Sequence, residues 1–385
     1  MGLRVLHLID SGGLYGAEQM LLTLVEEQMR QGLEPTILSA GKPGINEKAI
    51  EAEAHRRGLP LVRWRMLAGF NPRQAWKILK WSGSQGFQIL HSHGYKFNVL
   101  LGIWPRRFIK AQLVTTVHGY VMSSFPSRSW LYESLDRWAL RRFDHVVLVD
   151  QGMERIPGLA SLPERSRRVV PNGLSPAVEQ APALPAEIAR FRERHSTCFV
   201  AVGRLSPEKN FSLLIRSFAE AIKGDQDCGL VILGAGGQEQ HLKQLANELG
   251  VSEHLFFAGY VENAGALLGQ FDALLISSDT EGLPMALLEA MRAGVPVAAT
   301  SVGAIPEVLS GSSAEPAGLL VPPGQDSELS KAIFALISDP HKRTALAKRA
   351  HRRFHDQFTA PAMAETYSQC YAAVLKGAVA REAQA

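Results

Sequence analysis

The sequence predicts an α/β protein made of two doubly wound domains, each with a parallel sheet between layers of helices. Its 385 residues exceed what one hydrophobic core usually covers, so two domains of ordinary size are expected. In both halves, short apolar or β-branched runs alternate with segments of helical periodicity, which is the pattern of parallel α/β sheets. A proline-rich stretch at residues 174–194 separates the two series, as an interdomain linker does.

In the first half, each strand is predicted from a short apolar run. The runs are RVLHLID (residues 4–10), PTILSA (35–40), FQILHSH (87–93), QLVTTVH (112–118) and HVVLVD (145–150). Between the first two, AEQMLLTLVEEQMRQ has helical periodicity and is closed by Gly32. We expect these elements to form an N-terminal domain over residues 1–175.

The second half repeats the alternation after the linker. Its predicted strands are CFVAVGRL (198–205), GLVILGAG (229–236), HLFFAGYV (254–261), FDALLISS (271–278), PVAATS (296–301) and GLLVPPG (318–324). We expect them to form a second doubly wound domain at residues 195–357. The last segment, residues 358–385, should be helical after a break near Thr359 to Pro361 and should pack back on the first domain.

Composition limits the class of protein. With 46% hydrophobic and 20% charged residues, the chain is typical of soluble globular proteins. Its three cysteines form no CxxC pair, which favours a reducing compartment over a disulfide scaffold. The N-terminus leads directly into a predicted strand, and no apolar run approaches the roughly 18 to 20 residues that a membrane-spanning helix needs. We therefore expect a cytoplasmic protein without a transmembrane segment.

Charge is distributed unevenly along the chain. Residues 56–168 hold 19 Lys or Arg against six Asp or Glu, whereas the rest of the chain is net acidic. Aromatic and basic residues interleave in IWPRRFIK (103–110) and RSWLYESLDRWALRRF (128–143), a pattern that suits an anionic membrane surface or a phosphorylated ligand. Solvated faces of ordinary surface helices are the alternative. Nucleic acid is not an expected partner, because no recognised binding motif accompanies the charge.

Candidate ligand-binding residues follow the predicted strands, where open α/β sheets bind ligands. After the first strand, DSGGLYGAEQM places Gly12, Gly13 and Gly16 before a helix expected near Ala17, whose free N–H groups could face an anion. A simple tight turn is the alternative. In AVGRLSPEKN, Arg204 and Lys209 precede a helix and suit a diphosphate, although both could instead be surface residues.

The stretch SSDTEGLPMALLEAMRAG holds two carboxylates in different surroundings. Because Pro284 favours the first turn of a helix, we expect the helix to run from about Leu283 to Arg292. Glu281 then lies in the loop before it, and Glu289 lies two turns along an apolar helix. A carboxylate there needs a partner, which could be vicinal sugar hydroxyls or a buried salt bridge.

The segment EGLPMALLEA resembles the Glu-x7-Glu motif of retaining glycosyltransferase family 4, nucleotide-sugar-dependent enzymes of the GT-B fold. Further motifs follow the family's order: GGLYGAE, TTVHG, VVPNGL, VGRLSPEKN, FAGYV and GAIPEV. The resemblance spans nearly the whole chain. It implies two Rossmann-like domains facing a central cleft, with the acceptor bound by the N-terminal domain and the donor mostly by the C-terminal one.

The resemblance also implies roles for individual residues. Arg204 and Lys209 would hold the diphosphate, and Glu289 would accept hydrogen bonds from the ribose hydroxyls. Glu281 would hold the donor sugar, and His118 would lie beside the reacting sugar; these two, with Arg204 and Lys209, are the expected catalytic residues. The other implied donor-binding residues are Gly12, Gly13, Gly16, Asn172, Gly203, Gly234, Gly259, Tyr260, Val261, Gly282, Leu283 and Met285. Glu307 in GAIPEV is a weaker candidate.

The implied reaction moves a sugar from a nucleoside diphosphate to an acceptor hydroxyl with retention, by a same-face displacement in which a leaving-phosphate oxygen helps to deprotonate the acceptor. No metal or other cofactor is expected, because Arg204 and Lys209 supply the positive charge. Two positions depart from the family pattern: Gly119 follows His118 where Asp is common, and Ala235 stands where an acid is common. His91 and His93 could share a metal ion, but no acidic or Cys ligand lies nearby in sequence, so pocket lining or core packing is expected.

Substrate identity stays open. Backbone is expected to contact the base, so no side chain separates UDP, GDP and ADP sugars. Among these donors, UDP sugars are favoured over GDP sugars. The acceptor would be a glycan or lipid-linked glycan, in cell-envelope or exopolysaccharide synthesis, met at the inner face of the membrane. Two alternatives are a nucleotide-sugar epimerase of the same fold and a non-catalytic nucleotide-sugar sensor.

Overall fold

The computed structural model describes residues 2–10, 12–67, 69–118, 128–176, 181–224, 227–311 and 315–382. The chain divides into two compact units, one of Met1–Gly173 with Ala360–Ala385 and one of Leu174–Thr359. Each unit contains a parallel sheet with helices on both faces, so the predicted fold class is confirmed. Among the described residues, no helix is long and apolar enough to span a bilayer.

The first unit has a seven-stranded parallel sheet in the order β3-β2-β1-β4-β5-β6-β7. The strands are β1 Arg4–Ile9, β2 Glu34–Gly41, β3 Leu61–Arg65, β4 Ile89–Ser92, β5 Gln112–Val117, β6 His145–Leu148 and β7 Arg167–Val169. The edge strands β3 and β7 were not predicted. Their sequences, LVRWR and RRV, carry arginines and are only partly buried, as edge strands often are, so they lack the apolar run that marks a central strand.

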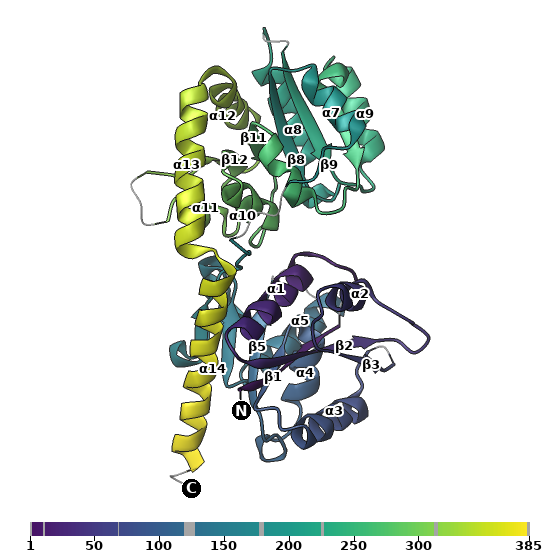
Figure 1. Cartoon of the computed structure of the whole chain (residues 1–385), viewed down its shortest axis with the longest axis vertical. Helices are drawn as coiled ribbons and strands as arrows, with labels where there is room; N and C mark the ends of the chain where they lie inside the picture. Colours follow the sequence, from purple (N-terminus) through teal and green to yellow (C-terminus); the bar gives the residue numbers. More distant parts are fainter. Residues whose placement is uncertain are drawn as a thin grey trace. The chain divides into compact units, whose positions relative to one another are not determined.

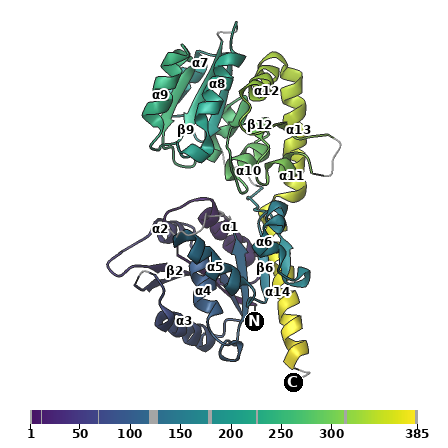
Figure 2. The same ribbon diagram turned by 180° about the vertical axis from the view of Figure 1, so that it is seen from behind.

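Helices cover both faces of this sheet. They are α1 Gly16–Arg30, α2 Ala49–Arg56, α3 Pro72–Ser84, α4 Tyr95–Gly102, α5 Arg128–Leu140, α6 Pro157–Ala160 and α14 Ala360–Glu382, with short 3₁₀ turns at Arg106–Phe108, Gln151–Arg155 and Glu164–Ser166. On one face, α1 and α14 lie against the sheet (Figure 1). Met20 of α1 belongs to the same buried cluster as Tyr367 and Tyr371 of α14 and the central strands. On the other, α3 and α4 bury Ile78 and Phe97 (Figure 2).

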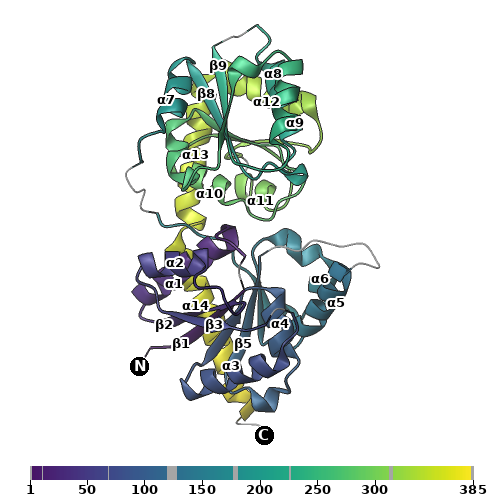
Figure 3. The same ribbon diagram turned by 90° about the vertical axis from the view of Figure 1, so that its right-hand side faces the viewer.

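The second unit has a six-stranded parallel sheet in the order β10-β9-β8-β11-β12-β13. The strands are β8 Thr197–Val202, β9 Cys228–Leu233, β10 Leu255–Gly259, β11 Ala273–Ile276, β12 Val297–Thr300 and β13 Leu319–Val321. Figure 3 shows the sheet between two helical layers, α7, α10, α11 and α13 on one face and α8, α9 and α12 on the other. The helices are α7 Ala186–Glu193, α8 Phe211–Ala221, α9 Glu239–Glu248, α10 Met285–Arg292, α11 Ile305–Leu309, α12 Asp326–Ser338 and α13 Pro340–Gln357, with 3₁₀ turns at Pro207–Lys209, Ser252–His254 and Ala264–Gln270.

Two expectations about element boundaries were wrong. The predicted linker at residues 174–194 contains helix α7, which forms because Ile188 and Phe191, three residues apart, are both buried against the sheet. Helix α10 begins at Met285 rather than near Leu283. Pro284 is its N-cap, with an extended backbone at ψ 126°, and so stands just outside the helix instead of in its first turn.

Candidate active site

The predicted donor-binding residues of the second unit lie where its parallel strands end. Gly203 and Arg204 follow β8, Gly234 follows β9, Tyr260 and Val261 follow β10, which ends at Gly259, and Glu281, Gly282 and Leu283 follow β11. Since the carboxyl ends of parallel strands lie along one edge of a sheet, the fold brings these segments together.

An ion pair joins two of these segments. Lys209 Nζ donates to Glu281 Oε1 at 2.5 Å, and Ser278 Oγ donates to the same oxygen at 2.6 Å. The Glu281 side chain is only 9% exposed, so this carboxylate is held in one place by two donors. Ser277 Oγ also donates to the Lys209 carbonyl at 3.0 Å, which fixes the lysine backbone beside the loop. The sequence assigned Lys209 and Glu281 to different parts of the donor and did not predict their contact.

The ion pair borders a pocket of about 150 Å³. Its walls include Val202 and Phe211 from the β8 side and Met285 from the first turn of α10. Lys209 has two further N–H donors and Glu281 a second oxygen, so both can contact a ligand without separating. The site therefore offers a cation and a carboxylate next to apolar walls, which suits a polar ligand that carries an anionic group.

Arg204 is exposed and pairs with an acid that the sequence did not single out. Its Nη2 donates to Glu208 Oε1 at 2.8 Å. Ser206 Oγ donates to the same oxygen at 2.6 Å, and this hydrogen bond together with the backbone and Arg204 lowers the pKa of Glu208 to about 2. A phosphate ligand would compete with Glu208 for the guanidinium.

Asn210 ties the loop after β8 to the loop after β11. It adopts the left-handed conformation (φ 45°), which Asn tolerates better than most residues, and its Oδ1 accepts from Leu213 N to cap α8. Its Nδ2 donates to Asp279 Oδ1 at 3.0 Å, and Asp279 N donates to the Glu208 carbonyl. The position of Asn210 before an apolar helical pattern could have identified it as a cap.

Two glycines let these loops approach closely. A Cβ at Gly234 would lie 1.8 Å from the Gly203 carbonyl oxygen, so this predicted donor-binding glycine is needed for chain packing. Gly303 has φ +54°, and a Cβ there would lie 2.1 Å from the Glu281 carbonyl oxygen. Its neighbour Ala304 donates its N–H to the Gly282 carbonyl at 3.0 Å. Gly303 was not predicted, yet its backbone packs directly against the backbone of the Glu281 loop.

Glu289 lies in the second turn of α10 with its carboxylate against Gly265. A Cβ at Gly265 would lie 2.2 to 2.4 Å from the carboxyl atoms of Glu289, so only glycine leaves this space. Burial raises the pKa of Glu289, and the charge of Arg292 opposes the rise. Within the described ranges no basic group is within 4 Å of this carboxylate, so the salt bridge considered as its alternative partner is not found there. Gly265 was missed because a lone glycine in VENAGALL has no distinctive sequence pattern.

The remaining predicted residues of the second unit are more peripheral. Tyr260 is 79% exposed and Leu283 is buried. Glu307 lies in α11, and its carbonyl accepts from Arg353 Nη2 at 3.0 Å, which gives it a structural contact with α13.

In the first unit, His118 follows β5 and is linked to a second histidine. Its Nε2 lies 3.1 Å from His93 Nδ1, and burial lowers the pKa of His118 to about 4, so the ring is neutral at physiological pH. Its Nδ1 is buried and has no hydrogen-bond partner among the described residues. Gly119, the position of a departure from the family pattern, lies outside the described residues.

The glycine-rich turn follows β1 in the first unit. Gly12 is exposed, Gly13 lies against the ring of Tyr15, and Gly16 is the first residue of α1, one residue earlier than expected. The predicted donor contact Asn172 is buried beyond β7.

A charged cluster that the sequence did not indicate lies at the end of β1. Asp10 accepts from Lys48 Nζ at 3.3 Å and also from Lys96. The Lys48 and Lys96 side chains are only 11% and 19% exposed, so two largely buried lysines share one carboxylate at this end of the sheet.

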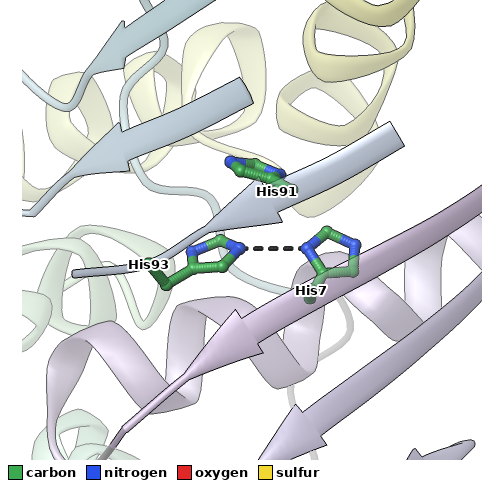
Figure 4. A group of neighbouring side chains, drawn as sticks. All are labelled: His7, His91 and His93. Carbon is green, nitrogen blue, oxygen red and sulfur yellow. Dashed lines mark hydrogen bonds between the residues drawn. The ribbon is translucent and has the colours of Figure 1, made fainter. Parts of the chain in front are cut away.

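His91 and His93 are both buried, together with His7 (Figure 4). Ring nitrogens of the three lie within 4.8 Å of one another, a spacing that a metal ion could use. His91 also contacts Tyr371 OH at 2.7 Å through Nδ1 and Thr116 Oγ1 at 2.8 Å through Nε2. These contacts place His91 in a buried polar network.

Comparison with known proteins gives the family. Residues 188–353 match the family model described as Glycosyl transferases group 1, and residues 15–178 match the one described as Glycosyltransferase Family 4. The chain belongs to the family 4 glycosyltransferases. The two matched segments lie one in each half of this glycosyltransferase and contain most of the predicted site residues.

Relatives of this glycosyltransferase cover most of its length. The 2-deoxystreptamine glucosyltransferase of Streptomyces kanamyceticus is 26% identical over 357 residues, which cover 85% of this chain and 91% of the relative. A GDP-mannose-dependent alpha-(1-6)-phosphatidylinositol monomannoside mannosyltransferase of Mycolicibacterium smegmatis is 30% identical over 270 residues, 64% of this chain and 66% of the relative. The crystal structure of Anabaena Alr3699/HepE in complex with UDP-glucose matches with a TM-score of 0.76 at 20% identity, covering 95% of this chain and 98% of that one. These likenesses agree with the GT-B fold.

Proposed function

We propose that this glycosyltransferase moves a sugar from a nucleoside diphosphate sugar to a hydroxyl of a glycan or lipid-linked acceptor, with retention of anomeric configuration. The observation that carries the proposal is the partly buried Glu289 carboxylate in the second turn of α10, which packs against Gly265 and has no basic group within 4 Å among the described residues. A desolvated carboxylate needs hydrogen bonds, and two vicinal ribose hydroxyls supply two. Gly265 leaves room at that carboxylate.

The diphosphate is assigned to Arg204 and Lys209. Arg204 is exposed and held only by Glu208, so it can turn to a phosphate, while Lys209 stays fixed by Glu281. As the sugar–phosphate bond breaks, negative charge grows on the leaving phosphate. Lys209, held in place by Glu281, is the preorganised cation there, and such a contact typically contributes about 3 kcal/mol. In this proposal a leaving-phosphate oxygen takes the proton of the acceptor hydroxyl on the same face, and no metal ion or other cofactor is needed.

The donor proposed first is a UDP sugar, with a GDP sugar second. Support for UDP comes from the structural likeness to a protein solved with UDP-glucose, and support for GDP from the mannosyltransferase relative that depends on GDP-mannose. Tyr260, exposed directly after β10, is placed to meet the base through its backbone and ring. The side chains at this edge do not separate the two bases.

The acceptor is proposed to be reached at the inner surface of the cell membrane. Phe108 and Trp138 are each more than 40% exposed, and Arg107 and Arg142 lie over their rings at 4.9 and 5.2 Å. Exposed aromatic rings beside arginines suit the headgroup region of an anionic bilayer. Sedimentation with anionic and with neutral vesicles tests this part: we expect binding to the anionic vesicles that Trp138→Ala weakens and high salt reverses.

The experiment that tests the function is a donor screen followed by product analysis. Purified protein is mixed with UDP, GDP and ADP sugars, and binding is measured by calorimetry for wild type, Glu281→Gln and Glu289→Gln. The donor that binds best is then incubated with membrane glycolipids, and the anomeric configuration of the product is read by NMR. We expect sugar transfer with retention; formation of an isomeric nucleotide sugar without an acceptor would show an epimerase instead.

A further inference from the structure

A chain of hydrogen-bonded side chains reaches His118 through the interior of the first unit. Gln28 Oε1 lies 2.8 Å from His7 Nε2, and His7 Nδ1 lies 3.0 Å from His93 Nε2 (Figure 4). His93 Nδ1 in turn lies 3.1 Å from His118 Nε2. The members come from α1, β1 and the ends of β4 and β5, and Gln28, His7 and His93 are almost fully buried. None of these contacts was predicted from the sequence.

We propose that Gln28, His7 and His93 are positioning residues that fix the tautomer of His118, with its proton on Nε2 and a free lone pair on Nδ1. The proposal rests on the proposed function, because it assigns that lone pair to a sugar or acceptor hydroxyl that donates to it. Its structural half, the tautomer, can be measured without any substrate.

The direction of donation along these hydrogen bonds is set by Gln28, which lies at the end away from His118. An amide oxygen can only accept, so His7 must carry its proton on Nε2, the nitrogen that faces Gln28 Oε1. A neutral imidazole has one N–H, so His7 Nδ1 accepts, and His93 must donate from Nε2. By the same step His93 Nδ1 accepts from His118 Nε2–H, which leaves His118 Nδ1 as an acceptor.

Each histidine in this series carries a single proton because burial keeps its ring neutral. Burial lowers the pKa of His7 and of His118 to about 4, and it lowers that of His93 well below the ordinary value, with the charges of neighbouring histidines adding to the effect. At physiological pH each ring in the chain therefore has one proton, and the sequence of donors and acceptors has a single solution for a given orientation of Gln28.

The orientation of the Gln28 amide is supported by its other end. Gln28 Nε2 donates to Tyr371 OH at 3.2 Å, and Tyr371 OH can then donate to His91 Nδ1 at 2.7 Å. A flipped amide would reverse both branches and would leave a buried N–H on His118 Nδ1 with no acceptor among the described residues. With the amide as placed, the position on this buried atom that has no partner among the described residues is a lone pair and not an N–H, and the proposal assigns a substrate hydroxyl to it.

A metal ion is the competing use of the same histidines. His7 Nδ1 and His93 Nε2 would have to leave each other and bind the ion, so metal binding and the hydrogen-bond chain exclude each other. Metal content is therefore a decisive measurement. Less than 0.1 equivalent of Zn²⁺, Fe or Ni in protein purified without chelators is expected, and about one equivalent that His7→Gln removes would overturn the proposal.

The matched variants are Gln28→Glu and Gln28→Met. A carboxylate at position 28 only accepts, so Gln28→Glu should keep the same tautomer, whereas Met has a similar length and removes the acceptor. Long-range ¹H–¹⁵N spectra of protein labelled at histidine report the tautomer of each ring, and His118→Gln assigns the His118 signals. We expect Nδ1 of His118 to be pyridine-type in wild type and Gln28→Glu, and a mixture of both tautomers in Gln28→Met.

The catalytic consequence is tested in the same variants. Gln28→Met should lower kcat about ten-fold, and Gln28→Glu should restore most of it. An Nδ1–H tautomer in wild-type protein would overturn the proposal whether or not the protein transfers sugar. A changed tautomer with wild-type kcat would refute its catalytic half and leave the proposed transferase function standing. Because the wild-type spectrum alone decides the tautomer, poor folding of a variant does not prevent the test.

Discussion

The strand edges of the two units use the same architecture for opposite electrostatics. At the edge of the second unit, two ion pairs hold charged side chains after β8, Lys209 with Glu281 and Arg204 with Glu208. At the centre of the first unit's edge, the end of β5 presents a neutral histidine held by other neutral histidines. The difference teaches that strand ends of similar architecture can hold an ionic side chain by an ion pair in one unit and a neutral histidine by a hydrogen bond in the other.

The largest expected effect comes from breaking the charged edge. Lys209→Ala should lower kcat/KM by about 10² to 10³, because it removes a fixed cation from the phosphate site and leaves the Glu281 carboxylate without its ion-pair partner. Lys243→Ala is the control, since Lys243 also forms an ion pair, with Glu239, but on the surface of α9. Equal losses in the two variants, measured as initial rates of sugar transfer, would contradict the special role of Lys209.

A glycine pair tests the Glu289 pocket without changing any charge. Gly265→Ala should weaken donor binding by about ten-fold, because its Cβ would take the place of the Glu289 carboxylate and force that carboxylate to move. Gly269→Ala lies in the same 3₁₀ segment, and its Cβ would meet only Ala293 Cβ at an ordinary 3.7 Å. Calorimetric Kd values should therefore change in the first variant and not in the second.

As pH falls, Glu289 in the second unit should gain a proton before His118 in the first unit does. The pKa of Glu289 is raised by burial, so its carboxylate gains a proton early as pH falls and accepts fewer hydroxyl hydrogen bonds. The pKa of His118 is about 4, so its lone pair survives until the pH is lower still. As pH falls, donor affinity should weaken in wild type at a higher pH than the ordinary pKa of a glutamate would give, and Glu289→Gln should lack this loss. A pH-independent wild-type affinity would count against the assigned role of Glu289.

The smallest effect concerns Asp136, a buried acid of the first unit. Burial raises the pKa of Asp136 to about 6, opposed by the hydrogen bond from Asn98. Because the folded-state pKa lies above the unfolded one, Asp136 favours folding below about pH 4, and this contribution is lost as pH rises through about 6. Asp136→Asn should raise stability by about 1 to 3 kcal/mol at pH 8 and by little at pH 4. The exposed Asp356→Asn should show no such pH-dependent gain in thermal unfolding.

The sequence predicted the parts of this glycosyltransferase that depend on periodicity and on residues next to strands. Central strands such as β1 and β9 are continuous apolar runs, and Arg204, Lys209 and Glu281 are marked by their place after a strand. Edge strands such as β3 were missed because they are only partly buried and carry arginines, so they lack the continuous apolar run that marks a central strand.

Contacts between distant segments could not be predicted either. Gly265 faces Glu289 from 24 positions away, and Gln28 reaches His7 from a different element. Such pairs depend on tertiary packing, so a single sequence carries no local signal for them.

A thermodynamic cycle tests most directly whether Glu289 binds the ribose of a nucleotide sugar. Calorimetry would measure the affinity of wild type and Glu289→Gln for the preferred nucleoside diphosphate and for its 2′,3′-dideoxy analogue. We predict that removing the carboxylate costs about ten-fold or more with the natural ribose and almost nothing with the analogue, a coupling of about 1.4 kcal/mol. Equal losses with both ligands would contradict the claim.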